Sequence, residues 1–279
     1  MKPETGIVRV GEWQIYVERY NYPGVTESVI CVNGALSTTL AFRNCVKSFK
    51  NRVNVILFDL PFIGKSRPHN QLNRPLPKSE EVLILNSLIE HYQPAYILSV
   101  SWGGLAALMA LSARPSSIRK AVVASFSTRI TPAMHNYIER AKVLLDEGKN
   151  HEVATLLNDE VGKYLPGLLK QANHEHIKNL DQETYRQASF HIGQISSLCH
   201  KDYIDIFRKI ETPIMFMNGE RDEYTTPDDI RDMGNYIQDC EFITIPEAGH
   251  FLDMESRPAA QYVGQLLNSY FFVEKAMAS

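Results

Sequence analysis

Apolar and polar positions recur with two different periods along the chain, and the alternation of these periods predicts the fold. Short apolar runs predict buried strands, and longer stretches with apolar residues three and four apart predict helices. Strands are expected at residues 28–32, 54–58, 96–100, 120–124, 213–217 and 241–245. Helices are expected at residues 38–50, 79–91, 102–113, 228–238 and 255–272. This order is typical of an α/β protein with a mostly parallel sheet and helices on both faces.

Two segments depart from this order. Residues 7–20 alternate between apolar and polar positions on either side of Gly11-Glu12, which predicts an N-terminal hairpin. Residues 127–208 have helix spacing and lack strand signals. We interpret this segment as a helical cap inserted after the sixth core strand, and residues 1–126 and 209–279 as the core domain. A cap excludes water from a site and shapes its pocket.

Ser101 follows the strand expected at residues 96–100, in the sequence Ser99-Val100-Ser101-Trp102-Gly103. In a nucleophile elbow a strand turns sharply into a helix and presents a strained serine, usually within Gly-x-Ser-x-Gly. Serine replaces the first glycine here, and the flanking positions remain small. The uncharged run from Ala95 to Ala113 has nearly the length of a membrane span. Its serines and glycines favour a buried strand followed by a buried helix.

Two further polar residues follow later strands. Asp222 comes after the strand at 213–217, and His250 comes after the strand at 241–245. The chain order serine, acid, histidine is that of the α/β-hydrolase catalytic triad. A histidine takes the serine proton and returns it to the leaving group, while a carboxylate orients the imidazole. We therefore predict Ser101, Asp222 and His250 as the catalytic residues; the alternative is a hydrolase-like fold that has kept them without catalysis.

Three other carboxylates lie near these positions. Glu223 is adjacent to Asp222, and Asp253 follows His250 closely. We expect both to be solvated carboxylates, although either is an alternative for the triad acid. Asp59 follows the strand at 54–58, and we expect it to orient the following loop rather than to take part in chemistry.

Acyl transfer by a serine also needs donors for the developing oxyanion. One expected donor is the backbone N–H of Trp102, directly after the nucleophile. The other is the backbone N–H of Ala35, in the loop after the strand at 28–32. Gly34 allows this loop to turn toward the pocket. The alternative is an ordinary turn that ends the strand.

Composition narrows the classes of function. The chain has 279 residues, 44% hydrophobic residues and a net charge of −3, so charge gives no drive toward nucleic acid or an anionic membrane. We see no apolar leader segment and no Cys-x-x-Cys pair, so we expect a cytoplasmic protein with reduced thiols. The cysteines are Cys31, Cys45, Cys199 and Cys240.

Motifs for a cofactor or a metal are weak. No glycine-rich phosphate loop is present, and His174-x-His176 alone is a weak metal motif. We therefore expect neither cofactor nor metal.

Several blocks of sequence resemble one branch of the α/β-hydrolases. They include Ser101-Trp102-Gly103-Gly104 and residues 58–70, 218–226 and 249–255 of the core, with 157–166 and 190–194 of the cap. This branch contains RhlA-type 3-(3-hydroxyalkanoyloxy)alkanoate synthases and PhaG-type 3-hydroxyacyl-ACP transacylases or thioesterases. The cap blocks are closer to the first type, and residues 219–222 and 249–255 to the second. The triad of the branch corresponds to Ser101, Asp222 and His250.

The resemblance implies a 3-hydroxyacyl thioester on acyl carrier protein (ACP) as the acyl donor. Our first expectation is an acyltransferase that joins two 3-hydroxyacyl groups into a hydroxyalkanoyloxyalkanoate, a precursor of rhamnolipids. The alternatives are a thioesterase, a transacylase that uses coenzyme A for polyhydroxyalkanoate synthesis, a general carboxylesterase, and a non-catalytic binding protein. Because ACP is acidic, we expect basic residues at the pocket mouth, with Lys65, Arg67 and Lys163 as candidates.

Overall fold

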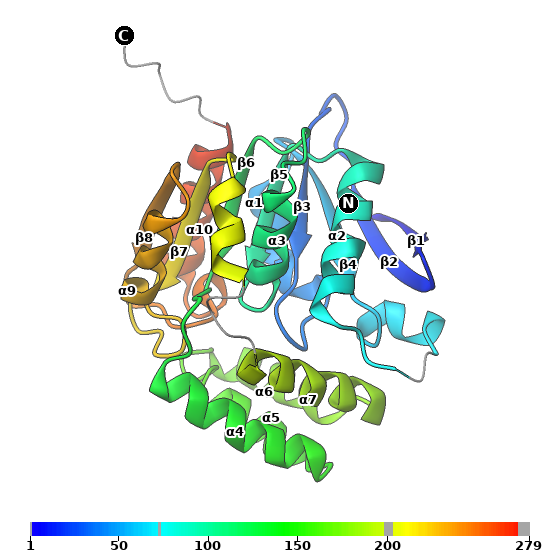
Figure 1. Cartoon of the computed structure of the whole chain (residues 1–279), viewed down its shortest axis with the longest axis vertical. Coiled ribbons are helices and arrows are strands. Elements are labelled where there is room, and N and C mark those ends of the chain that lie inside the picture. Colours follow the sequence, from blue (N-terminus) through cyan, green and yellow to red (C-terminus); the bar gives the residue numbers. More distant parts are fainter. Residues whose placement is uncertain (1, 72–73, 198–202, 273–279) are drawn as a thin grey trace.

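The computed structural model describes residues 2–71, 74–197 and 203–272. Within these residues the strands form one eight-stranded sheet in the order β1-β2-β4-β3-β5-β6-β7-β8 (Figure 1). Their bounds are Glu4–Val10 (β1), Trp13–Tyr20 (β2), Ser28–Val32 (β3), Asn54–Asp59 (β4), Tyr96–Val100 (β5), Lys120–Ala124 (β6), Ile214–Gly219 (β7) and Cys240–Ile245 (β8). The predicted α/β-hydrolase architecture is therefore confirmed, with β3 to β8 parallel and an antiparallel N-terminal hairpin.

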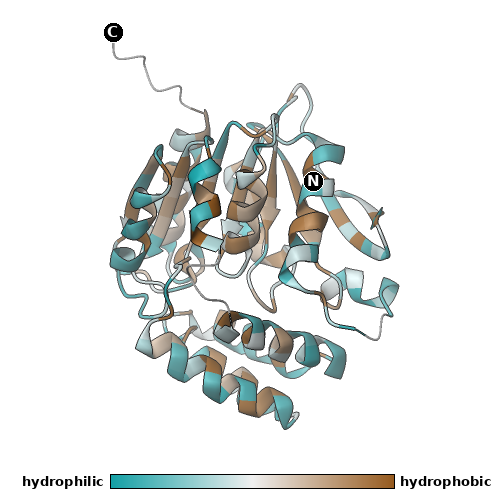
Figure 2. Ribbon diagram, in the orientation of Figure 1, coloured by the Kyte–Doolittle hydropathy of each residue, from teal (hydrophilic) through white to brown (hydrophobic). Residues whose placement is uncertain are grey.

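Helices cover both faces of the sheet. Their bounds are Arg43–Ser48 (α1), Lys78–Tyr92 (α2), Gly103–Ser112 (α3) and Arg257–Phe272 (α10). Successive side chains of a strand point to opposite faces. Ile30 of β3 therefore packs in one apolar cluster with α2 and α3, and its neighbour Cys31 packs in a second cluster with α1 and α10. The hydropathy colouring shows the central strands as largely apolar (Figure 2).

A group of helices separates β6 from β7. These helices are α4 (Pro132–Asp146), α5 (Asn150–Asp159), α6 (Gly167–Lys178) and α7 (Gln182–Ser197). They lie together at one end of the sheet (Figure 1) and share a small apolar cluster that includes Leu145, Val153 and Tyr185. Thr131 caps α4 by accepting a hydrogen bond from the Met134 N–H, and Pro132 occupies the first turn, where its missing N–H costs nothing. We propose to treat this segment as the cap of the core domain.

Some expected elements differ in detail. The helix expected at 228–238 is a short α9 (Pro227–Ile230) followed by a 3-10 helix, η4 (Arg231–Asn235). Gly234 and Asn235 of η4 are poor helix formers, which disfavours an α-helix that continues to residue 238. The helix expected at 38–50 begins as a 3-10 helix, η1 (Thr39–Phe42). Three further 3-10 helices were not predicted, namely η2 (Gly64–His69), η3 (Asp205–Lys209) and η5 (Leu252–Met254).

The uncharged run at 95–113 forms β5 and α3, as expected. In the part of the chain that the structure describes, no helix combines the length and the apolar character needed to cross a bilayer. Cys31, Cys45 and Cys240 are free thiols, and Cys199 lies outside the described residues.

Candidate active site

Ser101 sits at the sharp turn between β5 and α3. Its φ angle is +49°, in the left-handed region that non-glycine residues rarely adopt, and its N–H donates to the Ala124 carbonyl at 2.8 Å. A Cβ atom on Gly103 would lie 2.5 Å from the Asn33 carbonyl oxygen, so this position admits only glycine without movement of the backbone. The local geometry is that of a nucleophile elbow.

Of the three predicted triad residues, His250 lies within hydrogen-bond distance of both Ser101 and Asp222. Asp222 follows β7 and His250 follows β8, so parallel strands bring both to the sheet end where Ser101 lies. His250 Nε2 is 3.0 Å from Ser101 Oγ, and His250 Nδ1 is 2.8 Å from Asp222 Oδ2. This arrangement permits proton transfer from the serine to the imidazole, with the carboxylate behind it.

Burial and charge shift the pKa values of Asp222 and His250 in opposite directions. Burial alone would raise the pKa of Asp222, but the charge and hydrogen bond of His250 and the bonds from Thr225 outweigh it and hold the pKa below its usual value. Burial alone would lower the pKa of His250, but the charge and hydrogen bond of Asp222 outweigh it and raise the pKa. Asp222 is therefore ionised at neutral pH, as a residue that orients the imidazole must be.

The structure adds supporting residues that were absent from the predicted site. The Thr225 hydroxyl donates to Asp222 Oδ2 at 2.5 Å, and the Ser125 hydroxyl donates to the His250 carbonyl at 2.6 Å. The Glu255 carboxylate accepts the N–H groups on both sides of His250, from Gly249 at 2.5 Å and from Phe251 at 2.9 Å. The only sequence signal for Glu255 was its place in the block 249–255.

The other carboxylates have different surroundings. Asp59 accepts the backbone N–H groups of Thr39 and Lys65, both at 2.8 Å, so it orders the following loop, as expected, and also the segment after β3. Glu223 is exposed and pairs with Lys163 at 2.7 Å. The expectation of a solvated Asp253 is wrong, because this residue of η5 is partly buried and the burial raises its pKa to about 6.

The loop after β3 lies beside the elbow. A Cβ atom on Gly34 would be 3.3 Å from Ser101 Cβ, and Leu36 has a φ angle of +57° that turns the chain back. This placement suits Ala35, next to Gly34, as an oxyanion donor. Trp102 is the N-cap residue directly before α3, and its side chain is buried.

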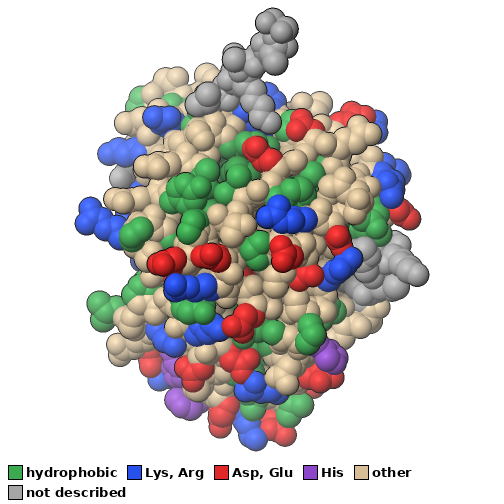
Figure 3. Space-filling view, turned by 90° about the vertical axis from the view of Figure 1, so that its left-hand side faces the viewer, with side chains coloured by type: hydrophobic (Ala, Val, Ile, Leu, Met, Phe, Trp, Pro, Cys, Tyr) green, Lys and Arg blue, Asp and Glu red, His purple; other side chains and the backbone are tan. Residues whose placement is uncertain are grey.

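The three basic candidates for carrier docking are all paired within the chain. Lys65 Nζ is 2.9 Å from Glu18, and Lys163 Nζ is 2.7 Å from Glu223. Arg67 joins the core to α7 through Asp181 and Glu183, each at 2.7 Å. On the face shown in Figure 3, basic and acidic side chains are interspersed. Part of the charge of each candidate is thus neutralised before any partner binds.

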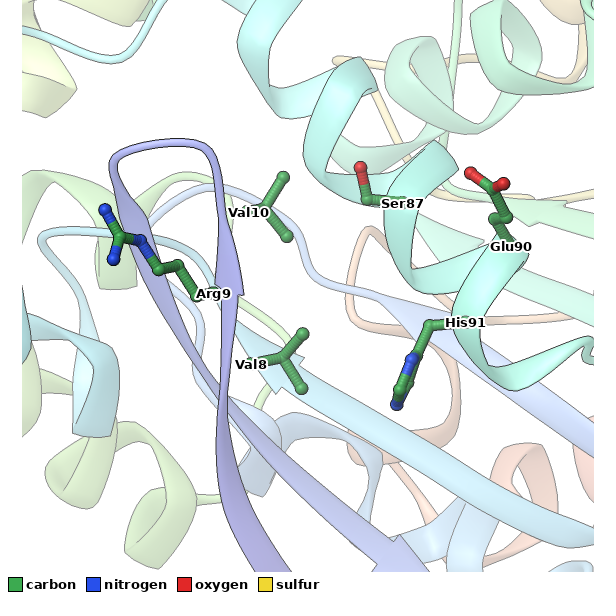
Figure 4. A pocket seen from close by; sticks show the side chains of 6 residues that line it. All are labelled: Val8, Arg9, Val10, Ser87, Glu90 and His91. Carbon is green, nitrogen blue, oxygen red and sulfur yellow. The ribbon is translucent and has the colours of Figure 1, made fainter.

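Two surface hollows lie outside the triad. One lies between β1 and α2 and is lined by Val8, Arg9, Val10, Ser87, Glu90 and His91 (Figure 4). None of these residues contacts the triad, so this hollow has no part in the chemistry argued here. The other lies between the cap and the core, and its lining includes Arg140, Lys163 and Glu223.

The two histidines considered for a metal have separate partners. His174 Nε2 lies 3.2 Å from the Thr155 hydroxyl, and His176 Nε2 lies 3.0 Å from the Leu36 carbonyl oxygen. In the described ranges, no group of three or more histidine, cysteine, aspartate or glutamate side chains is placed to hold a metal ion.

The fold and the Ser–His–Asp geometry are those of the α/β hydrolases. The sequence pattern of the α/β hydrolase fold matches residues 27–256, and the chain belongs to this family. Solved structures agree: an α/β hydrolase enzyme from a Medee basin deep-sea metagenome library, MGS-M2, superposes with a TM-score of 0.81 at 19% identity, covering 97% of this chain and 98% of that one. The enol-lactonase from Burkholderia xenovorans LB400 has a TM-score of 0.75 at 18% identity, over 94% of this chain and 100% of its own.

Relatives that are more similar to this chain in sequence are named for a specific activity. The (R)-3-hydroxydecanoyl-ACP:CoA transacylase of Pseudomonas aeruginosa is 42% identical over 271 residues, or 97% of this chain and 90% of its own. The protein of the same name from Pseudomonas putida is 40% identical, over 94% of this chain and 89% of its own. These relatives confirm the resemblance to the transacylase branch. Neither is named for joining two hydroxyacyl groups, so that expectation stays untested.

Proposed function

We propose that the protein is a serine acyltransferase that moves a 3-hydroxyacyl group from ACP to coenzyme A. The observation that carries this proposal is the pair of hydrogen bonds at His250, to Ser101 and Asp222, in a chain 42% identical to an ACP:CoA transacylase. The proposal replaces the joining of two hydroxyacyl groups as the first candidate, because the similar relatives named above are transacylases.

The first half of the reaction forms an acyl-enzyme. His250 Nε2 takes the proton of Ser101 Oγ as the oxygen attacks the thioester carbonyl carbon. Ala35 and Trp102 offer backbone N–H groups to the tetrahedral oxyanion, which strengthens these bonds where charge develops. The carbon–sulfur bond then breaks, and the protonated imidazole returns the proton to the departing phosphopantetheine thiol. Ser101 is left as an ester of the 3-hydroxy acid.

The second half repeats these steps in reverse with a new acceptor. The thiol of coenzyme A gives its proton to His250 and attacks the ester carbonyl, and Ser101 leaves with that proton restored. Water or the hydroxyl of a second 3-hydroxyacyl group could take the place of this thiol in the same site. The helices α4 to α7 lie over the end of the sheet and would select the acceptor by excluding water.

The decisive experiment identifies the acyl acceptor. Purified protein is incubated with 3-hydroxydecanoyl-ACP, with and without coenzyme A, and the products are identified by mass spectrometry. We expect 3-hydroxydecanoyl-CoA only when coenzyme A is present, and no product from Ser101→Ala. A hydroxyalkanoyloxyalkanoate would instead establish the joining reaction, and free 3-hydroxydecanoate a thioesterase.

Two measurements separate the remaining alternatives. Hydrolysis of short soluble esters with no reaction on acyl-ACP would indicate a general carboxylesterase. Absence of fluorophosphonate labelling at Ser101 in the folded protein would indicate a binding protein that has kept the hydrolase fold without its chemistry. Either result would contradict the proposal.

A further inference from the structure

A cluster of charged and aromatic side chains lies against Trp102, the residue after Ser101. Lys78 and Glu81 come from α2, and His191 comes from α7. Lys78 is 5% exposed, Glu81 2% and Trp102 9%, and the His191 side chain is 12% exposed. Lysine and glutamate are almost never buried this deeply unless they are paired. A buried ion pair next to the elbow therefore calls for an explanation that apolar packing does not supply.

Glu81 is the centre of this cluster. Its carboxylate accepts hydrogen bonds from Lys78 Nζ at 2.5 Å and from Trp102 Nε1 at 3.0 Å, and it lies 2.7 Å from His191 Nε2. Burial alone would raise the pKa of Glu81, but Lys78 and His191 outweigh it and bring the pKa to about 2. Glu81 is therefore ionised at neutral pH, accepts from Lys78 and Trp102, and contacts His191, whose Nε2 also lies 2.6 Å from Gln187 Nε2.

These contacts hold the Trp102 indole on several sides. Lys78 Nζ lies 3.6 Å from the centroid of the Trp102 ring, a close cation–π contact. The His191 ring stacks on the indole with centroids 4.6 Å apart and planes 24° apart. With its edge bonded to Glu81, the indole cannot rotate without breaking a buried hydrogen bond. A fixed side chain restricts the backbone of the same residue, and the Trp102 N–H is an expected oxyanion donor.

The cluster also connects the cap to the elbow. One turn before His191, Gln187 exchanges two hydrogen bonds with the backbone of Leu76, both at 2.8 Å. One turn earlier still, the Thr184 hydroxyl donates to the Phe62 carbonyl at 2.5 Å. These bonds seat α7 on the core and keep His191 over Trp102.

We propose that Glu81 is a positioning residue for acyl transfer: together with Lys78 and His191 it holds Trp102 so that the backbone N–H of that residue meets the developing oxyanion. Because His191 belongs to α7, the oxyanion site is complete only when this helix is seated on the core. The inference rests on the proposed role of Ser101 but not on the identity of the acyl acceptor.

The test uses the spectroscopic signal of Trp102 to detect whether its indole stays fixed. The chain has two tryptophans, so Trp13→Phe leaves Trp102 as the single indole. In this background Glu81→Gln is compared with Glu80→Gln, the same change one residue earlier, on a side chain that bonds Trp13 and Arg74 and not Trp102. We measure near-ultraviolet circular dichroism of Trp102, the rate of Ser101 labelling by a fluorophosphonate, and kcat and KM with 3-hydroxydecanoyl-ACP.

For Glu81→Gln we expect labelling and kcat to fall about 10- to 100-fold, because a displaced oxyanion donor acts in the transition state. KM should stay within about twofold of the value for the unaltered Glu81, since the oxyanion donor does not contribute to binding of the ground-state substrate. The Trp102 dichroism should weaken as the indole loosens, and Glu80→Gln should change none of these quantities. Glu81→Gln with normal labelling, or with reduced labelling and an unaltered Trp102 spectrum, would overturn the inference.

A second variant guards against misfolding. Lys78→Met combined with Glu81→Gln removes both charges, so no buried ammonium is left unpaired. The same fall in labelling is expected from this folded double variant, and normal labelling would overturn the inference. Failure of the unaltered, folded protein to label at Ser101 would contradict the proposed function, which separates the two outcomes.

Discussion

His250 Nε2 lies 3.0 Å from Ser101 Oγ, although the two residues are 149 positions apart in the chain. The contact depends on β5 and β8 ending at the same edge of the sheet, with β6 and β7 between them. It also depends on Glu255 and Ser125, which hold the His250 backbone. The reactivity that we expect at Ser101 is therefore sensitive to changes some distance from the serine itself.

The pH dependence of acyl transfer should reflect the environment of His250. Its pKa is raised, because Asp222 outweighs burial, and the imidazole must be neutral to act as a base. We expect kcat/KM to fall on the acid side with an apparent pKa above the ordinary value of about 6.5. Asp222→Asn removes the stabilising charge, so this limb should move to lower pH while kcat falls about 10³- to 10⁴-fold.

The control for this profile is Asp228→Asn, at a carboxylate whose side chain is fully exposed. Asp228→Asn should leave both the acid side of the pH profile of kcat/KM and the value of kcat unchanged. An acid limb at the same pH in Asp222→Asn and in the unaltered protein would contradict the assigned role of Asp222.

Glu255 should act on catalysis through the His250 loop. Glutamine keeps one acceptor oxygen, so Glu255→Gln can satisfy only one of the two N–H groups that flank His250. We expect kcat to fall about tenfold with KM nearly unchanged, because a small displacement of the base affects the transition state most. Steady-state kinetics compare this variant with Glu247→Gln, in the same loop, where the carboxylate is 80% exposed. Equal activity of the two variants would rule out the positioning role.

Gly103 should be essential for stability, and Gly193 should not. Alanine at 103 would place its Cβ 2.5 Å from a backbone oxygen, while alanine at 193 in α7 would meet nothing within 4 Å. We expect Gly103→Ala to lower the free energy of unfolding by about 2 kcal/mol or more through overpacking. Gly193→Ala should raise it by about 0.5–1 kcal/mol through helix propensity. Urea denaturation measures both, and a stable Gly103→Ala would show that the loop yields more easily than the structure suggests.

Carrier docking remains a prediction, and the Lys163–Glu223 pair offers a two-sided test of it. Lys163→Met removes a basic side chain at the hollow between cap and core, and should raise KM for acyl-ACP about two- to fivefold. Glu223→Gln releases Lys163 from its partner and should lower the same KM. Hydrolysis of a small ester should be unaffected in both, and identical changes on both substrates would exclude docking at Lys163.

The sequence by itself determined the strand order along the chain and the three residues that meet at His250. Strand periodicity and turn residues are local, and the ends of parallel strands must share one edge of the sheet. For this reason Ser101, Asp222 and His250 could be predicted together from their positions after β5, β7 and β8.

Only the tertiary structure decided which polar residues support that site. Apart from the place of Glu255 and Thr225 in blocks that resemble the family, Glu255, Thr225 and Glu81 carry no local signal, because any exposed helix or loop also contains such residues. Their roles come from burial beside particular N–H groups, which depends on how distant elements pack. The same holds for Asp253, whose partial burial the sequence pattern did not indicate. It holds also for Lys65, Arg67 and Lys163, whose acidic partners lie far along the chain.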